Sequence, residues 1–137
     1  MGIQVLSLEV RSADDLAHAF ESAARERAGA IMVSGYIERA HQKQLAELWR
    51  KKRLATSCDT RLSVEQGVCL LGYGPSLNDL MRRAATYVDK ILKGAKPAEL
   101  PVQRPMKFDF IINLNVAKQI GLTIPPNVLA RADKVIK

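Results

Sequence analysis

The side chains best suited to bind a small molecule follow three successive apolar runs, at the point where each run ends. Ser34 and Tyr36 follow residues 30–33, Asp59 and Thr60 follow residues 54–58, and a glycine-bracketed tyrosine follows residues 68–71. A carboxylate, hydroxyls and backbone amides could hydrogen-bond a polar solute, while a tyrosine ring contacts its apolar part. The candidate ligand-binding residues are therefore Ser34, Tyr36, Asp59, Thr60, Tyr73, Gly74 and Ser76.

Each of these residues also has an ordinary structural interpretation. Asp59-Thr60 is typical of a turn or a helix cap, and Tyr36 and Tyr73 could be rim residues with hydrogen-bonded hydroxyls. Their recurrence after three strands nevertheless favours a site, because open α/β sheets bind ligands at the carboxyl ends of their strands.

No pattern typical of an enzyme is present. His18 and His41 lie in predicted helices, and neither has a partner at a spacing that suits nucleophilic or metal chemistry. Gly72-Tyr73-Gly74 lacks the remainder of a phosphate-binding loop. We therefore expect no catalytic residues, no metal and no cofactor.

The two cysteines, Cys58 and Cys69, are too few for a disulfide framework. Two interpretations stay open. They are a pair of buried thiols, or a Cys58–Cys69 bridge if their two strands are neighbours.

The chain has 137 residues and a net charge of +7, from 21 basic and 14 acidic side chains. The one dense basic cluster, residues 50–53, falls at a predicted helix end, where cations are favoured, and no aromatic residues interleave with it. We therefore expect no binding of nucleic acid. No apolar run is long enough to span a bilayer, and residues 1–10 do not resemble a signal peptide, so the chain as written is expected in the cytoplasm.

Hydrophobic periodicity predicts an alternation of strands and helices. Strands are expected at 3–10, 30–33, 54–58, 68–71 and 107–113, and helices after Ser12 and at 39–52, 62–66, 77–93, 116–120 and beyond Pro125-Pro126. The wholly apolar run 30–33 predicts a strand covered on both faces. The alternation favours an α/β fold whose mainly parallel sheet has helices on both faces.

The segments form one incomplete domain. Residues 1–74 supply βαβ units, 75–95 a crossover helix, 96–106 a proline-rich connector, and 107–137 a final strand with short helices. The helix at 77–93 carries an apolar stripe that we expect to be buried.

Several motifs resemble those of one family. They include Tyr-Gly-Pro-Ser-Leu at 73–77, Tyr-Val-Asp-Lys-Ile-Leu-Lys-Gly-Ala-Lys-Pro at 87–97 and Gly-Leu-Thr-Ile-Pro-Pro at 121–126. With them the chain resembles the C-terminal half of ABC-transporter substrate-binding proteins, in the branch that includes tryptophan-type members.

This resemblance implies a type I periplasmic-binding-protein-like lobe. Such proteins hold a solute between two lobes and deliver it to an ABC permease, so the ligand is expected to be an amino acid or a similar small polar or aromatic solute, and the location periplasmic. A lone lobe should bind its solute weakly, because capture needs closure of two lobes. With no first lobe here, we expect a homodimer that covers or swaps the helix at 77–93.

A second interpretation is a cytoplasmic flavodoxin- or receiver-like regulatory or protein-interaction domain, which would explain the missing signal peptide. A receiver needs an acidic pair after its first strand, and Arg11-Ser12 stands there instead. Residue pattern thus favours the solute-binding interpretation.

Overall fold

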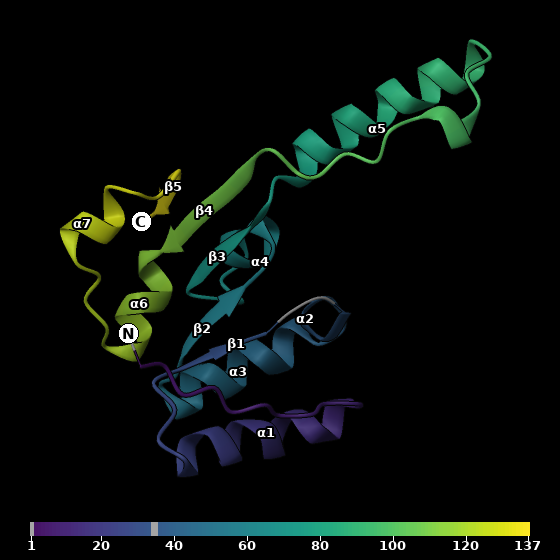
Figure 1. Ribbon diagram of the computed structural model, residues 1–137. Helices are drawn as coiled ribbons and strands as arrows, with labels where there is room; N and C mark the ends of the chain where they lie inside the picture. Colours follow the sequence, from purple (N-terminus) through teal and green to yellow (C-terminus); the bar gives the residue numbers. More distant parts are fainter. Residues whose placement is uncertain (1, 34–35) are drawn as a thin grey trace.

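The computed structural model describes residues 2–33 and 36–137 and contains one five-stranded sheet of order β1-β2-β3-β4-β5 (Figure 1). Strands β1 and β2, β2 and β3, and β4 and β5 pair in parallel, and β3 and β4 are antiparallel. The predicted α/β class with a mainly parallel sheet is confirmed. The elements are α1 (Ala13–Arg25), β1 (Ala30–Met32), α2 (Tyr36–Ala40), α3 (Gln42–Lys52), β2 (Ala55–Cys58), α4 (Arg61–Glu65), β3 (Leu71–Pro75), α5 (Leu77–Leu92), the 3-10 turn η1 (Pro97–Glu99), β4 (Phe108–Asn113), α6 (Leu114–Ile120), α7 (Pro126–Leu129) and β5 (Lys134–Ile136).

Helix α1 begins where the sequence predicts, because Ser12 and Asp15 form a capping box. The backbone N–H groups of Arg11 and Ser12 donate to Asp15 Oδ2 at 3.0 and 2.9 Å. These hydrogen bonds, the one from Arg11 first, lower the pKa of Asp15 below its usual range.

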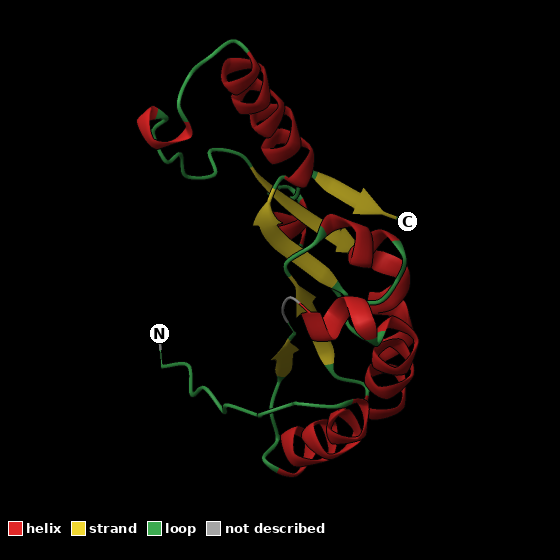
Figure 2. Ribbon diagram, turned by 90° about the vertical axis from the view of Figure 1, so that its right-hand side faces the viewer, coloured by secondary structure: helices red, strands yellow, loops and turns green. Residues whose placement is uncertain are grey.

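The core lies between the sheet and a layer of helices on one of its faces (Figure 2). Phe20 of α1 packs with Leu45 and Trp49 of α3, and all three are buried. The predicted double coverage of strand 30–33 is wrong. Met32 is 81% exposed, because no helix among the described residues covers that face of β1.

The predicted strand at 3–10 is also wrong. Residues 2–11 pair with no strand of the described sheet, and they pass β1 as a loop (Figures 1 and 2). Ile3 and Val5 are 77% and 84% exposed. Their alternation favours a strand, but a strand forms only where a neighbouring edge offers hydrogen-bonding partners.

The third strand begins and ends later than predicted, at 71–75 instead of 68–71. Glycines at 72 and 74, which suggested a turn, lie within the strand and face the loop that leads into α4. The strand continues to Pro75 because β4 pairs with it along its whole length, from Leu71–Ile112 to Pro75–Phe108.

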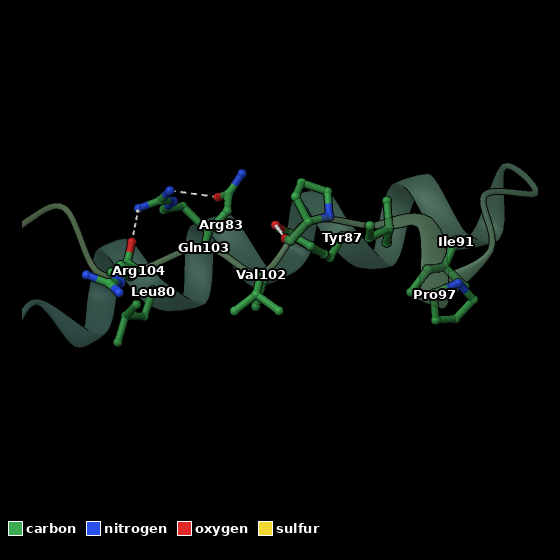
Figure 3. Close-up of a pocket in the computed structure, with 11 residues that line it drawn as sticks. Leu80, Arg83, Tyr87, Ile91, Pro97, Val102, Gln103 and Arg104 are labelled. Carbon is green, nitrogen blue, oxygen red and sulfur yellow. Dashed lines mark hydrogen bonds between the residues drawn. The ribbon is translucent and has the colours of Figure 1, made fainter.

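Helix α5 and the return segment form an arm, defined here as residues 77–106, that projects from the body (Figure 1). The helix has the predicted bounds within one residue, but the predicted burial of its apolar stripe is wrong, since no α5 side chain is buried. A groove of about 400 Å³ separates the helix from the return segment (Figure 3). Tyr87 spans it by donating to the Pro101 carbonyl at 2.6 Å, and Arg83 donates to Gln103 at 2.7 Å.

The C-terminal part contains a strand that the sequence analysis missed. Residues 134–136 form β5 beside β4, where Val135 was expected in a helix. Buried Asn113 anchors this region, because its Oδ1 caps α6 and its Nδ2 donates to the Val64 carbonyl at 2.8 Å. Gly121 ends α6 as predicted, with φ of 75°.

The expected helix at 39–52 divides into α2 and α3, with His41 between them.

The two cysteines form a disulfide bridge, which was one of the two interpretations that the sequence left open. Their Cα atoms lie 6.1 Å apart, within the usual disulfide range. The bridge ties the last residue of β2 to the segment before β3.

Candidate functional site

The carboxyl ends of β1, β2 and β3 lie at the same edge of the sheet, because these strands pair in parallel. Of the residues predicted to bind a ligand, Asp59 and Thr60 follow β2, and Tyr73 and Gly74 lie near the end of β3. Tyr36 begins α2 after β1. Ser34 lies outside the described residues. The structure thus brings the described strand ends together at one edge.

Thr60 caps helix α4, which is the structural role that the sequence analysis gave as the alternative to ligand binding. Its Oγ1 accepts a hydrogen bond from the Ser63 backbone N–H at 3.4 Å at the start of α4, and it donates to Glu38 Oε1 at 2.7 Å. The Ser63 hydroxyl donates to the same Glu38 oxygen. Thr60 therefore couples the end of β2 to α2.

Glu38 is a member of this edge that the sequence analysis did not single out. It is fully buried, and it comes from α2, the helix that follows the end of β1. Burial raises the pKa of Glu38, the hydrogen bonds from Ser63 and Thr60 oppose that rise, and the neighbouring Asp59 carboxyl adds to it. A neutral Glu38 avoids two adjacent negative charges. The only sequence signal was an acidic residue just after a predicted strand end.

Tyr73 belongs to an exposed aromatic cluster on the face of the sheet opposite α4. Its ring is stacked on Phe108, with ring centroids 5.6 Å apart and planes 15° apart. Its edge contact with Phe110 has a centroid distance of 6.3 Å. Tyr73 itself is 61% exposed. The cluster is an exposed aromatic surface formed by β3 and β4.

Gly74 and Ser76 have clear structural roles. A Cβ atom on Gly74 would lie 2.0 Å from the Asp59 carbonyl oxygen, so β3 passes directly against the end of β2. Ser76 is buried, and its backbone N–H donates to the Lys107 carbonyl at 2.9 Å, where the arm leaves and rejoins the body. A ligand contact by either residue stays a prediction.

Asp59 thus carries a carboxyl group at the end of β2, and its side chain interacts with Glu38. The Tyr73 ring cluster lies in β3 and β4. Within residues 2–33 and 36–137 no group of three or more His, Cys, Asp or Glu side chains is placed to hold a metal ion. No helix of that part is both long and apolar enough to cross a bilayer.

The chain thus combines a mainly parallel α/β sheet, a set of polar residues at one sheet edge and a projecting arm. The model of one family, described as ABC transporter substrate binding protein, matches residues 1–136. The chain therefore belongs to the ABC-transporter substrate-binding protein family. The receiver-like alternative has no comparable support.

Similar solved structures agree with this family. The ABC domain in complex with L-Trp from Streptococcus pneumoniae has a TM-score of 0.83 and 26% identity, over 98% of this chain and 46% of that one. A conserved domain protein from Vibrio cholerae has a TM-score of 0.77 and 27% identity, over 89% of this chain and 41% of that one. No curated protein matches.

The ligand-free, open structure of a substrate-binding protein with adhesive properties from Clostridium difficile shares the fold, with a TM-score of 0.64 and 17% identity. The match covers 93% of this chain and 42% of the Clostridium difficile protein. The chain thus spans less than half the length of the structures it resembles.

Proposed function

We propose that this chain is one half of a two-lobed, non-enzymatic solute clamp that serves an ABC importer. Its ligand is an amino acid or a similar small polar or aromatic solute, bound at the carboxyl ends of β1, β2 and β3. The ligand-binding residues proposed are those predicted from the sequence. The solute passes from the closed clamp to an ABC permease.

The single observation that supports this proposal is that Asp59, directly after β2, and Tyr73, whose exposed ring lies in the neighbouring strand β3, belong to the same edge of the sheet. A carboxylate can bind the amino group of an amino acid, and an aromatic surface can stack on its side chain. The similar Streptococcus pneumoniae structure holds L-Trp, which has both features.

The bridge between Cys58 and Cys69 supports a periplasmic location, since such bridges persist mainly in oxidising compartments. The arm supports a clamp with a second lobe. It extends from the site edge and carries an exposed apolar surface that includes Met81, Val88 and Val102.

A titration with L-tryptophan followed by backbone amide NMR tests the proposal. A lone lobe should bind in the millimolar range, because it lacks the contacts of the closed state. We expect progressive shifts at residues 59, 60, 73, 74 and 76, with almost no change in melting temperature. Tyr73→Ala and Asp59→Asn should each reduce these shifts, while Tyr87→Ala, on the arm, should leave them unchanged.

Shifts that avoid the strand ends, or that survive both site variants, would contradict the proposed site. A rise of many degrees in melting temperature would contradict weak binding by a lone lobe and show a pocket completed across two copies.

For the isolated chain we also propose the homodimer through residues 77–93. The stripe on α5 is apolar and unburied, and copies of the chain offer each other the same stripe. Light scattering should give a mass that rises with concentration. Met81→Ser with Val88→Ser should abolish that rise, and a constant monomer mass in the unaltered chain would refute the dimer.

A further inference from the structure

The outer edge of β1 has unused hydrogen-bonding groups. In the described sheet β1 pairs only with β2. The N–H of Val33 donates to the Ser57 carbonyl at 2.9 Å, so Val33 faces β2, and Met32, the neighbouring residue, points its N–H and carbonyl to the opposite side. That side of the strand borders a groove and not another strand.

The groove lies between this edge and residues 3–10, and α1 forms its floor. Leu16, Phe20 and Ala23 of α1 line the floor, while Val5 and Met32 belong to the two walls. Its volume is about 930 Å³. The walls of the groove are extended backbone, and its floor is apolar. A strand within a helix-covered sheet has the same surroundings, with extended neighbours on both sides and an apolar helix against one face.

The size of the groove agrees with one β-strand. A strand of five or six residues is about 17–20 Å long, roughly 4.8 Å wide and about 10 Å thick between packed layers, which corresponds to about 800–950 Å³. Residues 3–10 keep an alternating apolar pattern, yet Ile3 and Val5 stay exposed beside the groove. A strand in the groove would give both walls a pairing partner.

We propose that this groove, called here the strand slot, receives a β-strand from the polypeptide that supplies the other part of the clamp. The strand pairs with β1 on one side and with residues 3–10 on the other, and it packs apolar side chains on the partly buried Leu8 and Ile31, which line the groove. This inference rests on the proposed two-lobed function.

The occupant follows from the comparisons. The similar L-Trp-bound structure contains more than twice the length matched here, and this chain covers 46% of it. The remainder of such a clamp is the available source of an additional strand. A second copy of this chain is a poorer occupant, because its own extended segment, residues 3–10, already forms a wall of the slot.

A tethered strand tests the inference without any solute. Seven alternating Val and Thr residues are fused ahead of Met1 through a flexible Gly/Ser linker of roughly sixteen residues, long enough to span the slot and return. The matched control carries proline at alternate positions of the same strand, which removes every second hydrogen-bond donor. Amide hydrogen exchange is measured for Met32, residues 4–8 and, as an internal reference, Ile111.

We expect exchange at Met32 and residues 4–8 to slow at least tenfold relative to the proline control, with Ile111 unchanged. Equal exchange in the two fusions would overturn the strand slot. Slow exchange in the unfused chain, together with a dimer mass, would also overturn it, because a second copy would then fill the groove. Neither of these two outcomes affects the proposed function, because the solute titration tests that function independently.

Discussion

Gly74 lies against the backbone of Asp59, so closely that a Cβ atom added to Gly74 would stand 2.0 Å from the Asp59 carbonyl oxygen. The contact joins the end of β3 to the end of β2 at the candidate site. The partner atoms are backbone and cannot rotate away. Glycine at position 74 is thus required by the geometry of the site edge.

Gly74→Ala should destabilise the chain by at least about 2 kcal/mol, because the new methyl group forces backbone movement. Urea unfolding of the purified variant measures the change. Gly29→Ala is the matched control, since its Cβ would meet nothing within 4 Å. Similar unfolding midpoints for the two variants would show that β3 does not approach Asp59 as described.

Removal of the Cys58–Cys69 bridge should lower the free energy of unfolding by about 2–4 kcal/mol, because the bridge restricts the unfolded chain. Unfolding curves with and without a thiol reductant measure the loss. The unfolding curve of the variant with both cysteines changed to alanine should be the same with and without the reductant. Two reactive thiols in the unfolded, unreduced chain would disprove the bridge.

The buried Glu38 predicts a stability that falls as pH rises. Its pKa in the folded chain lies above the ordinary 4.5, so the folded state holds this proton more tightly than the unfolded state. Its stabilising contribution is complete below 4.5 and is lost as pH rises through the folded pKa. Relative to Glu38→Gln, the unaltered chain should lose stability across that range, as measured by chemical unfolding at several pH values.

Glu65 is a control for this pH dependence, because its pKa is lowered in the folded chain and that of Glu38 is raised. Hydrogen bonding to Lys134 is the first cause that lowers the pKa of Glu65, so its contribution is lost as pH falls through that lowered value. Glu65→Gln should therefore flatten the acid side of the profile, lower the free energy of unfolding by a constant amount above pH 4.5, and leave the pH slope there unchanged. Parallel profiles for Glu38→Gln and the unaltered chain would contradict the buried carboxyl.

Excision of the arm should leave the body folded. The Ser76 N–H already bonds the Lys107 carbonyl at 2.9 Å, and Pro75 pairs with Phe108, so an Asn-Gly turn in place of residues 77–106 would close a two-residue hairpin. The melting temperature should change by no more than a few degrees. The excised chain should also be monomeric by light scattering. Loss of cooperative unfolding would show that the arm stabilises the body.

Local signals predicted local structure well. The capping box of Ser12 and Asp15, the stripe of α5 and the stop at Gly121 were readable because their hydrogen bonds and periodicity involve residues within a few positions of one another. The candidate edge was also predictable, because polar residues at the ends of parallel strands must share one side of the sheet.

Strand bounds were less predictable, because pairing depends on distant partners. Residues 3–10 alternate like a strand but pair with no described strand, while 134–136 pair with β4 despite a helix-like pattern. The end of β3 at Pro75 is likewise determined by β4. Propensity describes what a segment can form, and the neighbouring edge decides whether it does.

The amino-acid sequence by itself determined the helices, their caps, the α/β class and the family resemblance, since these depend on near neighbours and on motifs. Only the tertiary structure decided that Glu38 is buried beside Asp59, that Tyr73 stacks on Phe108, and that one edge of β1 is unpaired. Burial, ring stacking and strand pairing are properties of segments brought together by folding, so no local pattern contains them.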